Sequence, residues 1–447
     1  MNRAQPYPKV LLVCNFNQST ANGITIRNLF QNWPKDRIAV AEFSGRIECV
    51  YTEGISQYYC LGEMESKFLW PFNLLSKPNS SRSYFLEESP KDSKPKQKPI
   101  LKKRLFLKVI ALRLKVAFLQ LSGLVLVSRK YFFSTQFDRW VMDFKPDVIY
   151  TSISDINKAH FVLEMRKRYN VKLTVHIFDD FLNTKHQYSL FSNYWKSRLE
   201  ITARRLFSES DLCLAISEKM SREYKEKYKR DFHPFHNPLD PKIWTKERAT
   251  STTIERSNSF TFVYTGKINR DTAKPLSLFI KALERLQALG YGTQLEIYTA
   301  TGLPEVLRLL GNINTKIIKG FIKNNELPIA LRKADGLFFP LDSSRKTRNY
   351  VRLSIATKAT EYMISGRPIF VFAPRDIAVV EYLQEHDAAY IVSSLDRLEK
   401  ATISFIENTR MRKRIAKNAE LRAKGFHLTT IVNEQLRSLL KQVSDTV

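Results

Sequence analysis

The chain is 447 residues long, 43% hydrophobic and strongly basic, with a formal net charge of +28. This length is enough for two α/β domains, and the hydrophobic content excludes an intrinsically disordered protein. Charged residues interrupt every apolar run before it reaches about 18 residues, so the sequence predicts no transmembrane helix. The excess of positive charge favours a polyanionic neighbour: nucleic acid, anionic lipid or phosphorylated substrates.

The four cysteines, Cys14, Cys49, Cys60 and Cys213, show no metal-ligand spacing. Cys14 and Cys213 lie in apolar, strand-like runs, where cysteine behaves as a small hydrophobic residue. We therefore expect reduced, buried thiols. The N-terminal residues show no signal-peptide pattern, so we expect a cytoplasmic protein.

The first half alternates strands and helices, which predicts a parallel sheet. Residues 9–16 form an apolar run typical of a strand, Asn22-Gly23 marks a turn, and residues 24–33 predict a helix. A glycine just before a helix would let an anion approach the free N–H groups of the first turn, although an ordinary turn is the alternative. Three later strands are predicted, at residues 146–150, 172–178 and 211–217.

Polar and acidic side chains follow the strand at 172–178. His176, Asp179 and Asp180 lie at its predicted end, where ligand sites of parallel sheets form. A histidine buried in the sheet is the alternative for His176. The adjacent carboxylates of Asp179 and Asp180 could bind a metal, but capping a helix is the commoner role of such residues and the one we expect.

A basic region interrupts the first half. Residues 76–104, rich in Ser, Pro and Lys, predict a flexible insertion, and residues 105–127 predict a helix that is not purely apolar. Its cations argue against a membrane span, because each costs about 2.5–3.5 kcal/mol at mid-bilayer. We expect either an amphipathic helix on an anionic membrane surface or a core helix with a solvated basic edge. The candidate lipid-binding cations are Arg104, Lys108, Arg113 and Lys115.

The second half contains another βα series. We predict an N-terminal domain over 1–240, a linker over 241–259, a C-terminal domain over 260–425, and a helix over 426–447 that could return to the N-terminal domain. Two parallel-sheet domains would place a ligand cleft at the carboxyl edges of their strands. Six strands are predicted in the C-terminal domain, at residues 260–265, 295–298, 316–318, 336–340, 369–372 and 390–392.

The most informative block is S-I-A-T-K-A-T-E-Y-M-I-S-G-R-P-I-F, residues 354–370. It predicts a helix that ends near Gly366, followed at once by a buried strand. Lys358 and Glu361 are three residues apart and share one helix face. A cation beside a carboxylate could hold a phosphate and a sugar hydroxyl together; the alternative is an ordinary surface ion pair.

This block resembles the nucleotide-sugar signature of GT-B glycosyltransferases, most closely the S-I-P-x-K-x-x-E-Y-M-x-x-G-x-P pattern of the family 4 (group 1) enzymes. The resemblance implies two Rossmann-like parallel-sheet domains facing a cleft, with no metal or other cofactor. Two positions depart from the family: Ala356 replaces a proline, and Leu353 stands where a first glutamate is found.

The resemblance also implies roles for individual residues. Glu361 would accept hydrogen bonds from the ribose, and Phe321 and Ile322 would contact the nucleobase unless they are ordinary core residues. His176 would approach the transferred sugar, and Gly23 would face the donor. The resemblance places seven residues toward the phosphates: Gly266, Lys267, Arg270, Lys274, Ser354, Thr357 and Lys358. For the basic ones among them, the alternative is a solvated side chain on the surface.

Most enzymes of the family that this chain resembles transfer the sugar with retention of the anomeric configuration. In the mechanism usually proposed for them, the leaving phosphate oxygen takes the acceptor proton. An inverting enzyme would instead need a carboxylate base near the acceptor, for which Asp155, Asp179 or Asp180 are candidates.

We therefore expect a glycosyltransferase that moves a sugar from a nucleotide-sugar donor to a lipid-linked saccharide or cell-surface polysaccharide precursor. It would work at the cytosolic face of the cell membrane as a peripheral protein. A non-catalytic GT-B partner subunit is the alternative, supported by Leu353. Nucleic-acid binding is disfavoured, because the sequence has no zinc, RNP-type or helix-turn-helix pattern.

Overall fold

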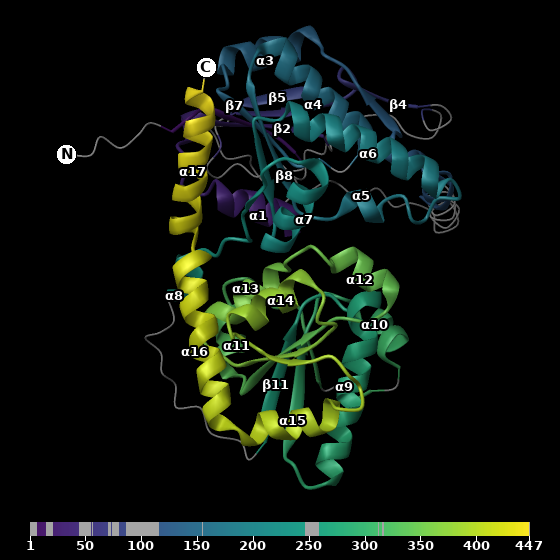
Figure 1. Ribbon diagram of the computed structural model, residues 1–447, viewed down its shortest axis with the longest axis vertical. Coiled ribbons are helices and arrows are strands. Elements are labelled where there is room, and N and C mark those ends of the chain that lie inside the picture. The colour runs from purple at the N-terminus through teal and green to yellow at the C-terminus, as the bar shows by residue number, and fades with distance from the viewer. Residues whose placement is uncertain are drawn as a thin grey trace, which may run out of the picture. The chain divides into compact units, whose positions relative to one another are not determined.

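The computed structural model describes residues 7–14, 21–43, 55, 57–69, 73, 80–85, 116–153, 155–245, 259–311, 313–314 and 317–446. The four predicted lipid-binding cations between residues 104 and 115 lie outside these residues, as does most of the predicted insertion over 76–104. The chain divides into two compact units. The first comprises Met1–Ala215, Ser221–Pro234 and Asn433–Val447, and the second comprises Ile216–Met220 and Phe235–Val432 (Figure 1).

The first unit is built on an eight-stranded sheet in the order β10-β9-β8-β7-β1-β2-β3-β5. All neighbours are parallel except β3 and β5. A small antiparallel pair, β4 and β6, accompanies it. The strand bounds are β1 Val10–Val13, β2 Ile38–Glu42, β3 Gln57–Cys60, β4 Ser66–Phe68, β5 Arg82–Phe85, β6 Arg129–Tyr131, β7 Val148–Thr151, β8 Lys172–Ile177, β9 Leu212–Ala215 and β10 His233–Pro234.

Buried strands explain why this sheet forms. β1, β2, β7 and β9 are buried along their whole length, as expected of parallel strands covered on both faces. Cys14, Cys60 and Cys213 are buried free thiols, as expected, and Cys49 lies outside the described residues. β5 falls inside the range predicted as a flexible insertion and instead pairs with β3.

Side-chain caps begin α3 and α4 of the first unit. The Ser134 side chain accepts a hydrogen bond from Phe137 N, and the Asp155 side chain accepts one from Lys158 N. α7 begins in the second unit, and α17 ends in the first. The bounds are α1 Ala21–Leu29, η1 Lys35–Arg37, η4 Leu124–Leu126, α3 Thr135–Phe144, α4 Ile156–Tyr169, α5 Phe181–Thr184, α6 Ser192–Glu209, α7 Glu218–Tyr228 and α17 Thr429–Asp445.

Two helix predictions in this unit need correction. The predicted turn at Asn22-Gly23 is wrong, because α1 already begins at Ala21 and both residues lie in its first turn. The helix predicted over 105–127 is described only from residue 116, and it ends at residue 122. There Gly123 adopts a left-handed φ of 75°, which a glycine tolerates without steric cost, and the short η4 follows.

The second unit contains a six-stranded, fully parallel sheet in the order β13-β12-β11-β14-β15-β16. Two buried hydrophobic clusters line it, and Phe279 stacks on Phe338 with ring centroids 3.8 Å apart. The strand bounds are β11 Phe260–Thr265, β12 Thr293–Tyr298, β13 Ile318–Gly320, β14 Gly336–Pro340, β15 Ile369–Phe372 and β16 Tyr390–Val392.

Helices alternate with these strands. α9 begins with a capping box between Asn269 and Thr272. The residues predicted as a linker begin with a short helix, α8, and no helix of the described residues is long and apolar enough to cross a membrane. The bounds are α8 Pro241–Thr245, α9 Arg270–Ala288, α10 Leu303–Leu310, α11 Leu327–Lys333, α12 Arg345–Val351, α13 Thr357–Ile364, α14 Ala378–Glu385, α15 Leu398–Glu407 and α16 Thr409–Phe426.

Candidate functional site

The carboxyl edge of the second sheet gathers most of the predicted site residues. Gly266 and Lys267 follow β11, and Phe321 follows β13. The carboxyl ends of parallel strands meet at one edge, where open α/β sheets bind ligands. Helix α13, which carries Lys358 and Glu361, immediately precedes β15.

Lys358 lies over aromatic rings at this edge. Its Nζ is 4.5 Å from the ring centroid of Tyr264 and 5.1 Å from that of Phe339. A Cβ added to Gly266 would lie 3.6 Å from the same Nζ. The ammonium therefore faces the loop after β11, held in part by cation–π attraction.

Lys358 and Glu361 are both partly buried. Burial lowers the pKa of Lys358 to about 8, against the attraction of Glu361. Burial likewise raises the pKa of Glu361 to about 7, against the attraction of Lys358. Among the described residues, neither the ammonium nor the carboxylate has a hydrogen-bond or ion-pair partner. The pair thus differs from an ordinary surface ion pair, and perturbed groups of this kind concentrate at functional sites.

Two tyrosines fix the backbone around the pair. Thr265 N donates to Tyr362 Oη at 2.9 Å, which ties α13 to the end of β11. Tyr264 Oη donates to the carbonyl of Lys267 at 2.8 Å. Both tyrosines are fully buried, so the loop after β11 is held from within the unit.

The loop before α13 is also held by side chains of the second unit. Ser217 Oγ donates to the carbonyl of Leu353 at 2.6 Å, and Asn237 Nδ2 donates to that of Ile355 at 2.8 Å. The Leu353 side chain is only 1% exposed. The position at which the family carries its first glutamate is therefore part of the hydrophobic interior here.

The remaining candidates of this unit lie around the same edge. Lys267, Arg270 and Lys274 are solvent-exposed. Ser354, in the loop before α13, and Thr357, its first residue, are partly buried. Lys274 lines a cavity of about 110 Å³ together with Ser343 and Ala373, which follow β14 and β15. The cations are thus free to reorient toward a bound anion.

The two predicted base contacts differ in their surroundings. Phe321 is 71% exposed, so it is not a core residue, and its ring is open to stacking. Ile322 packs partly against the hydrophobic core.

In the first unit, His176 and Gly23 are buried. His176 lies within β8, fully shielded from solvent, with its Nδ1 2.6 Å from Tyr150 Oη. Gly23 lies in the first turn of α1. Their contacts with a sugar donor stay predictions.

Two of the three candidate carboxylate bases have contacts that fix them in the first unit. Asp155 caps α4 and pairs with Lys158 Nζ at 3.3 Å. Asp180 is buried and accepts from Tyr224 Oη at 3.0 Å, and Asp179 beside it is partly buried. No cluster of metal-type side chains occurs in the part of the chain that the structure describes.

Residues 280–435 match the family model described as "Glucosyltransferase 3-like, C-terminal domain". No curated protein matches the sequence. Sucrose-phosphate synthase from Thermosynechococcus elongatus aligns with a TM-score of 0.58 at 11% identity, covering 97% of this chain and 98% of that chain. HepE of Anabaena, in complex with UDP and glucose, aligns with a TM-score of 0.60 at 14% identity, covering 97% of this chain and 99% of that chain.

The chain has the GT-B glycosyltransferase fold. The predicted fold class, with two parallel-sheet units, is confirmed. One chain of a GtfA/B complex aligns less completely, with a TM-score of 0.50 at 15% identity over 71% of this chain and 62% of that chain.

No role was predicted from the sequence for three aromatic residues near Lys358. Tyr264, Phe339 and Tyr362 hold Lys358 or the β11 loop. Tyr264 and Phe339 stand near the ends of apolar strand runs, and only contacts between distant segments give them their roles.

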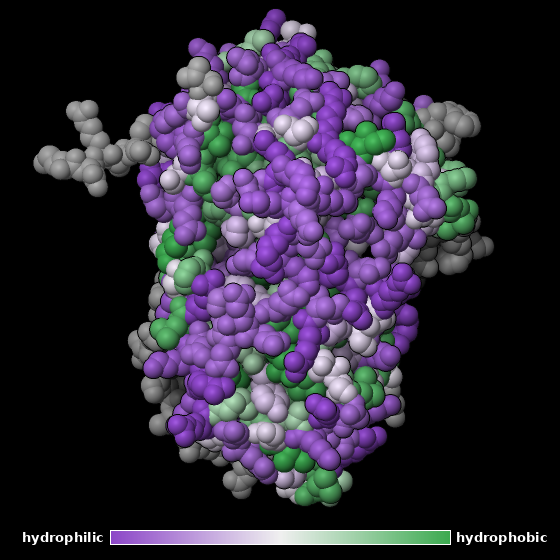
Figure 2. All heavy atoms as spheres, viewed as in Figure 1, coloured by the Kyte–Doolittle hydropathy of each residue, from purple (hydrophilic) through white to green (hydrophobic). Residues whose placement is uncertain are grey.

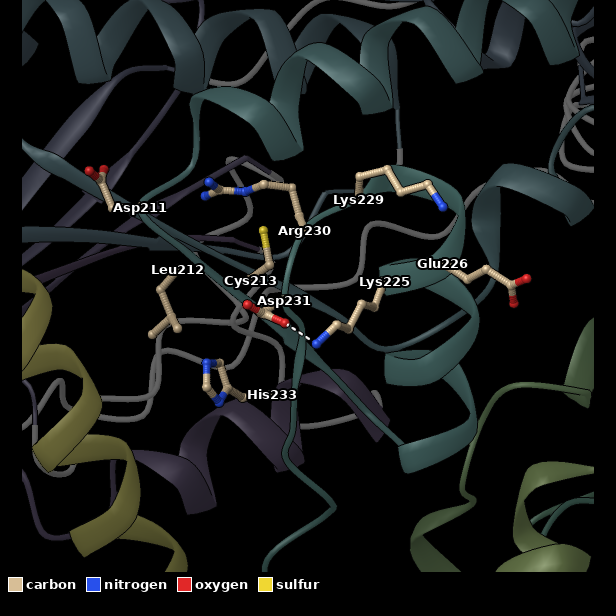
Figure 3. Close-up of a pocket in the computed structure, with 9 residues that line it drawn as sticks. All are labelled: Asp211, Leu212, Cys213, Lys225, Glu226, Lys229, Arg230, Asp231 and His233. Carbon is tan, nitrogen blue, oxygen red and sulfur yellow. Dashed lines mark ion pairs between the residues drawn. The ribbon is translucent and has the colours of Figure 1, made fainter.

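A separate cavity of about 700 Å³ lies in the first GT-B unit (Figure 3). None of the predicted site residues lines it. Its lining includes both basic and acidic side chains, and Lys225 forms an ion pair with Asp231 at 2.6 Å. The residues that line it are Asp211, Leu212, Cys213, Lys225, Glu226, Lys229, Arg230, Asp231 and His233.

Proposed function

We propose that the protein is a glycosyltransferase that uses a nucleotide-activated sugar. The observation that carries this proposal is the Lys358–Glu361 pair at the carboxyl edge of the second sheet. Its charges are partly buried, and among the described residues neither has a hydrogen-bond or ion-pair partner. The match to a glucosyltransferase domain supports it, as does the binding of UDP-glucose by the structurally similar HepE. A UDP-hexose is therefore the donor to test first.

The chemistry follows from the charges around this edge. When the bond between the sugar and the diphosphate breaks, the leaving diphosphate gains negative charge. Lys358, Lys267 and Lys274 would stabilise that charge, with Arg270 nearby as a further cation. Glu361 would position the nucleotide through the ribose hydroxyls. In a retaining reaction the leaving phosphate oxygen takes the acceptor proton, so none of Asp155, Asp179 and Asp180 is required.

The acceptor we propose is a lipid-linked saccharide or a cell-surface polysaccharide precursor at the cytosolic membrane face. The polybasic sequence around residues 102–115 supports this, because such segments bind anionic lipid.

Release of nucleoside diphosphate from nucleotide sugars tests the activity. Glu361→Gln should lower kcat/KM about 10- to 100-fold, because a hydrogen bond to a charged group contributes about 1.5–3 kcal/mol. Glu284→Gln makes the same chemical change on the exposed face of α9 and serves as the control. Equal turnover by both variants would refute the role of Glu361.

The second candidate is a non-catalytic partner subunit of a glycosylation complex. The buried Leu353, in place of the first glutamate, favours it, and the similarity to a chain of the GtfA/B complex supports it. This candidate predicts nucleotide binding that depends on Lys358 without release of sugar from any donor. Turnover of one donor by the purified protein excludes it.

A further inference from the structure

Two segments of the first unit carry seven large apolar side chains on its surface. We call these residues the apolar face: each is between 45% and 79% exposed. They come from the helical residues 116–122 and from the turn between α5 and α6 with the first turn of α6. The apolar face comprises Val116, Phe118, Leu121, Tyr188, Leu190, Phe191 and Tyr194.

Hydrogen bonds join the two segments into one surface. The carbonyl of Leu121 accepts from Leu190 N at 2.8 Å and from Ser189 Oγ at 3.2 Å. Trp195 Nε1 donates to the carbonyl of Ser122 at 2.8 Å. A Cβ on Gly123 would lie 2.0 Å from the same nitrogen, so only glycine permits this approach. The apolar face is therefore held in place by its buried side and does not consist of two loose loops.

Soluble proteins rarely expose contiguous apolar patches of this kind unless something binds there. On the side of the molecule drawn in Figure 2, green hydrophobic residues occur at several separate places on a surface that is otherwise largely purple. Tyrosine and phenylalanine beside leucine are the residues that favour the boundary between lipid headgroups and acyl chains. The composition of the apolar face thus fits a lipid surface.

Positive charge predominates in the sequence of both segments. Residues 181–199 contain no Asp or Glu, and their cations Lys185, Lys196 and Arg198 are all exposed. Residues 93–137, which include 116–122, also contain no Asp or Glu but carry eleven Lys and Arg. Cations that flank an apolar surface attract the negative headgroups of an anionic bilayer.

We propose that the apolar face inserts into the headgroup and acyl boundary of an anionic lipid bilayer. The inference deepens the proposed function, on which it rests for its membrane-bound acceptor. It adds an apolar component to the electrostatic one: the cations bring the protein to the surface, and the apolar face holds it there. Because salt screens only the first component, part of the binding persists at high ionic strength.

Vesicle flotation of the full chain tests this. The vesicles contain phosphatidylcholine alone or phosphatidylcholine with phosphatidylglycerol, at 0.1 and 0.5 M NaCl. The double variant Leu190→Ser, Phe191→Ser removes two exposed side chains and should weaken partitioning about 10- to 100-fold, from the loss of apolar area. Leu289→Ser with Leu421→Ser, two exposed leucines of the second unit, is the matched control and should float like the wild type.

Equal flotation of the wild type and the L190S/F191S variant would overturn the inference. So would a wild-type oligomer that the same variant converts to a monomer without any change in flotation, since the face would then bind protein. Donor turnover measured without vesicles separates the two proposals. Turnover that the L190S/F191S variant retains while its flotation is lost supports both, and flotation that depends on Leu190 and Phe191 without any turnover supports the lipid inference alone.

Discussion

The second unit partly buries the charges of Lys358 and Glu361, and among its described residues neither has a hydrogen-bond or ion-pair partner. Such groups cost folding free energy, because burial disfavours the charged form of each. A site that must bind a phosphate and a ribose gains from the same arrangement, since the ligand supplies the missing partners. Substitution of either residue should therefore have opposite effects on stability and on nucleotide binding.

Glu361→Gln should stabilise the protein without nucleotide. The pKa of Glu361 is raised from 4.5 to about 7, so the folded state binds more protons than the unfolded state between these values, and stability falls as pH rises through them. Above pH 7 the variant should gain on the order of 1–2 kcal/mol, a discounted figure since one pKa unit corresponds to about 1.4 kcal/mol. Denaturant unfolding at pH 8 measures this; a destabilised variant would indicate a structural role.

Donor binding should depend on pH within a narrow range. Glu361 must be ionised to accept from the ribose, and Lys358 must be protonated to hold phosphate, so free enzyme is competent mainly between about pH 7 and 8. The logarithm of kcat/KM for the donor should therefore fall on both sides. Glu361→Gln should remove the acid limb and keep the basic one. An unchanged acid limb in this variant would assign that limb to another group.

At the element scale, the buried strands of the second unit were predicted best. β11, β14, β15 and β16 have the predicted bounds, because each reads as a short, largely apolar run. β14 and β15 are also buried along their whole length, as expected of strands covered on both faces. The start of α1 was missed, because Asn22-Gly23 is a strong local turn signal that the helix overrides.

The site could be predicted only in part. The residue types in the 354–370 block pointed to Lys358 and Glu361. The contact of Tyr362 with Thr265 joins residues 97 positions apart, which no local pattern reveals. The same holds for the bonds from Ser217 and Asn237 to the loop before α13.

The loop before α13 should depend on Asn237. Asn237→Ala leaves the buried carbonyl of Ile355 without this donor, which should destabilise the second unit by about 1–3 kcal/mol and raise the KM for the donor. Thermal unfolding and donor kinetics measure the two effects. Gln384→Ala, which shortens an exposed amide of α14, should change neither. A normal KM for the donor in a destabilised Asn237 variant would show that the loop before α13 does not contribute to donor binding.

At the scale of the whole molecule, the chain forms two units that share helices α7 and α17 along the sequence. Leu436 and Leu440 of α17 are fully buried in the first unit. Leu436→Ala should therefore cost about 2–5 kcal/mol there, while nucleotide binding by the second unit continues. Denaturant titrations with and without UDP measure this. UDP should stabilise the unfolding transition of the second unit, and the mutation should shift the transition of the first unit to lower denaturant concentration. Loss of UDP binding in the variant would contradict the assignment of the site to the second unit.

The net charge of +28 makes every anion a weak ligand of this protein, so the central claim needs a matched control. Lys413 provides it: it lines a basic cavity of about 400 Å³ beside the amino end of β11, together with Arg367 and Arg412. The experiment is isothermal titration calorimetry of UDP with the wild type, Lys358→Met and Lys413→Met. Binding should weaken about 10-fold or more in the Lys358 variant and stay at the wild-type value in the Lys413 variant. Unchanged affinity in the Lys358 variant, or loss in the Lys413 variant, would contradict it.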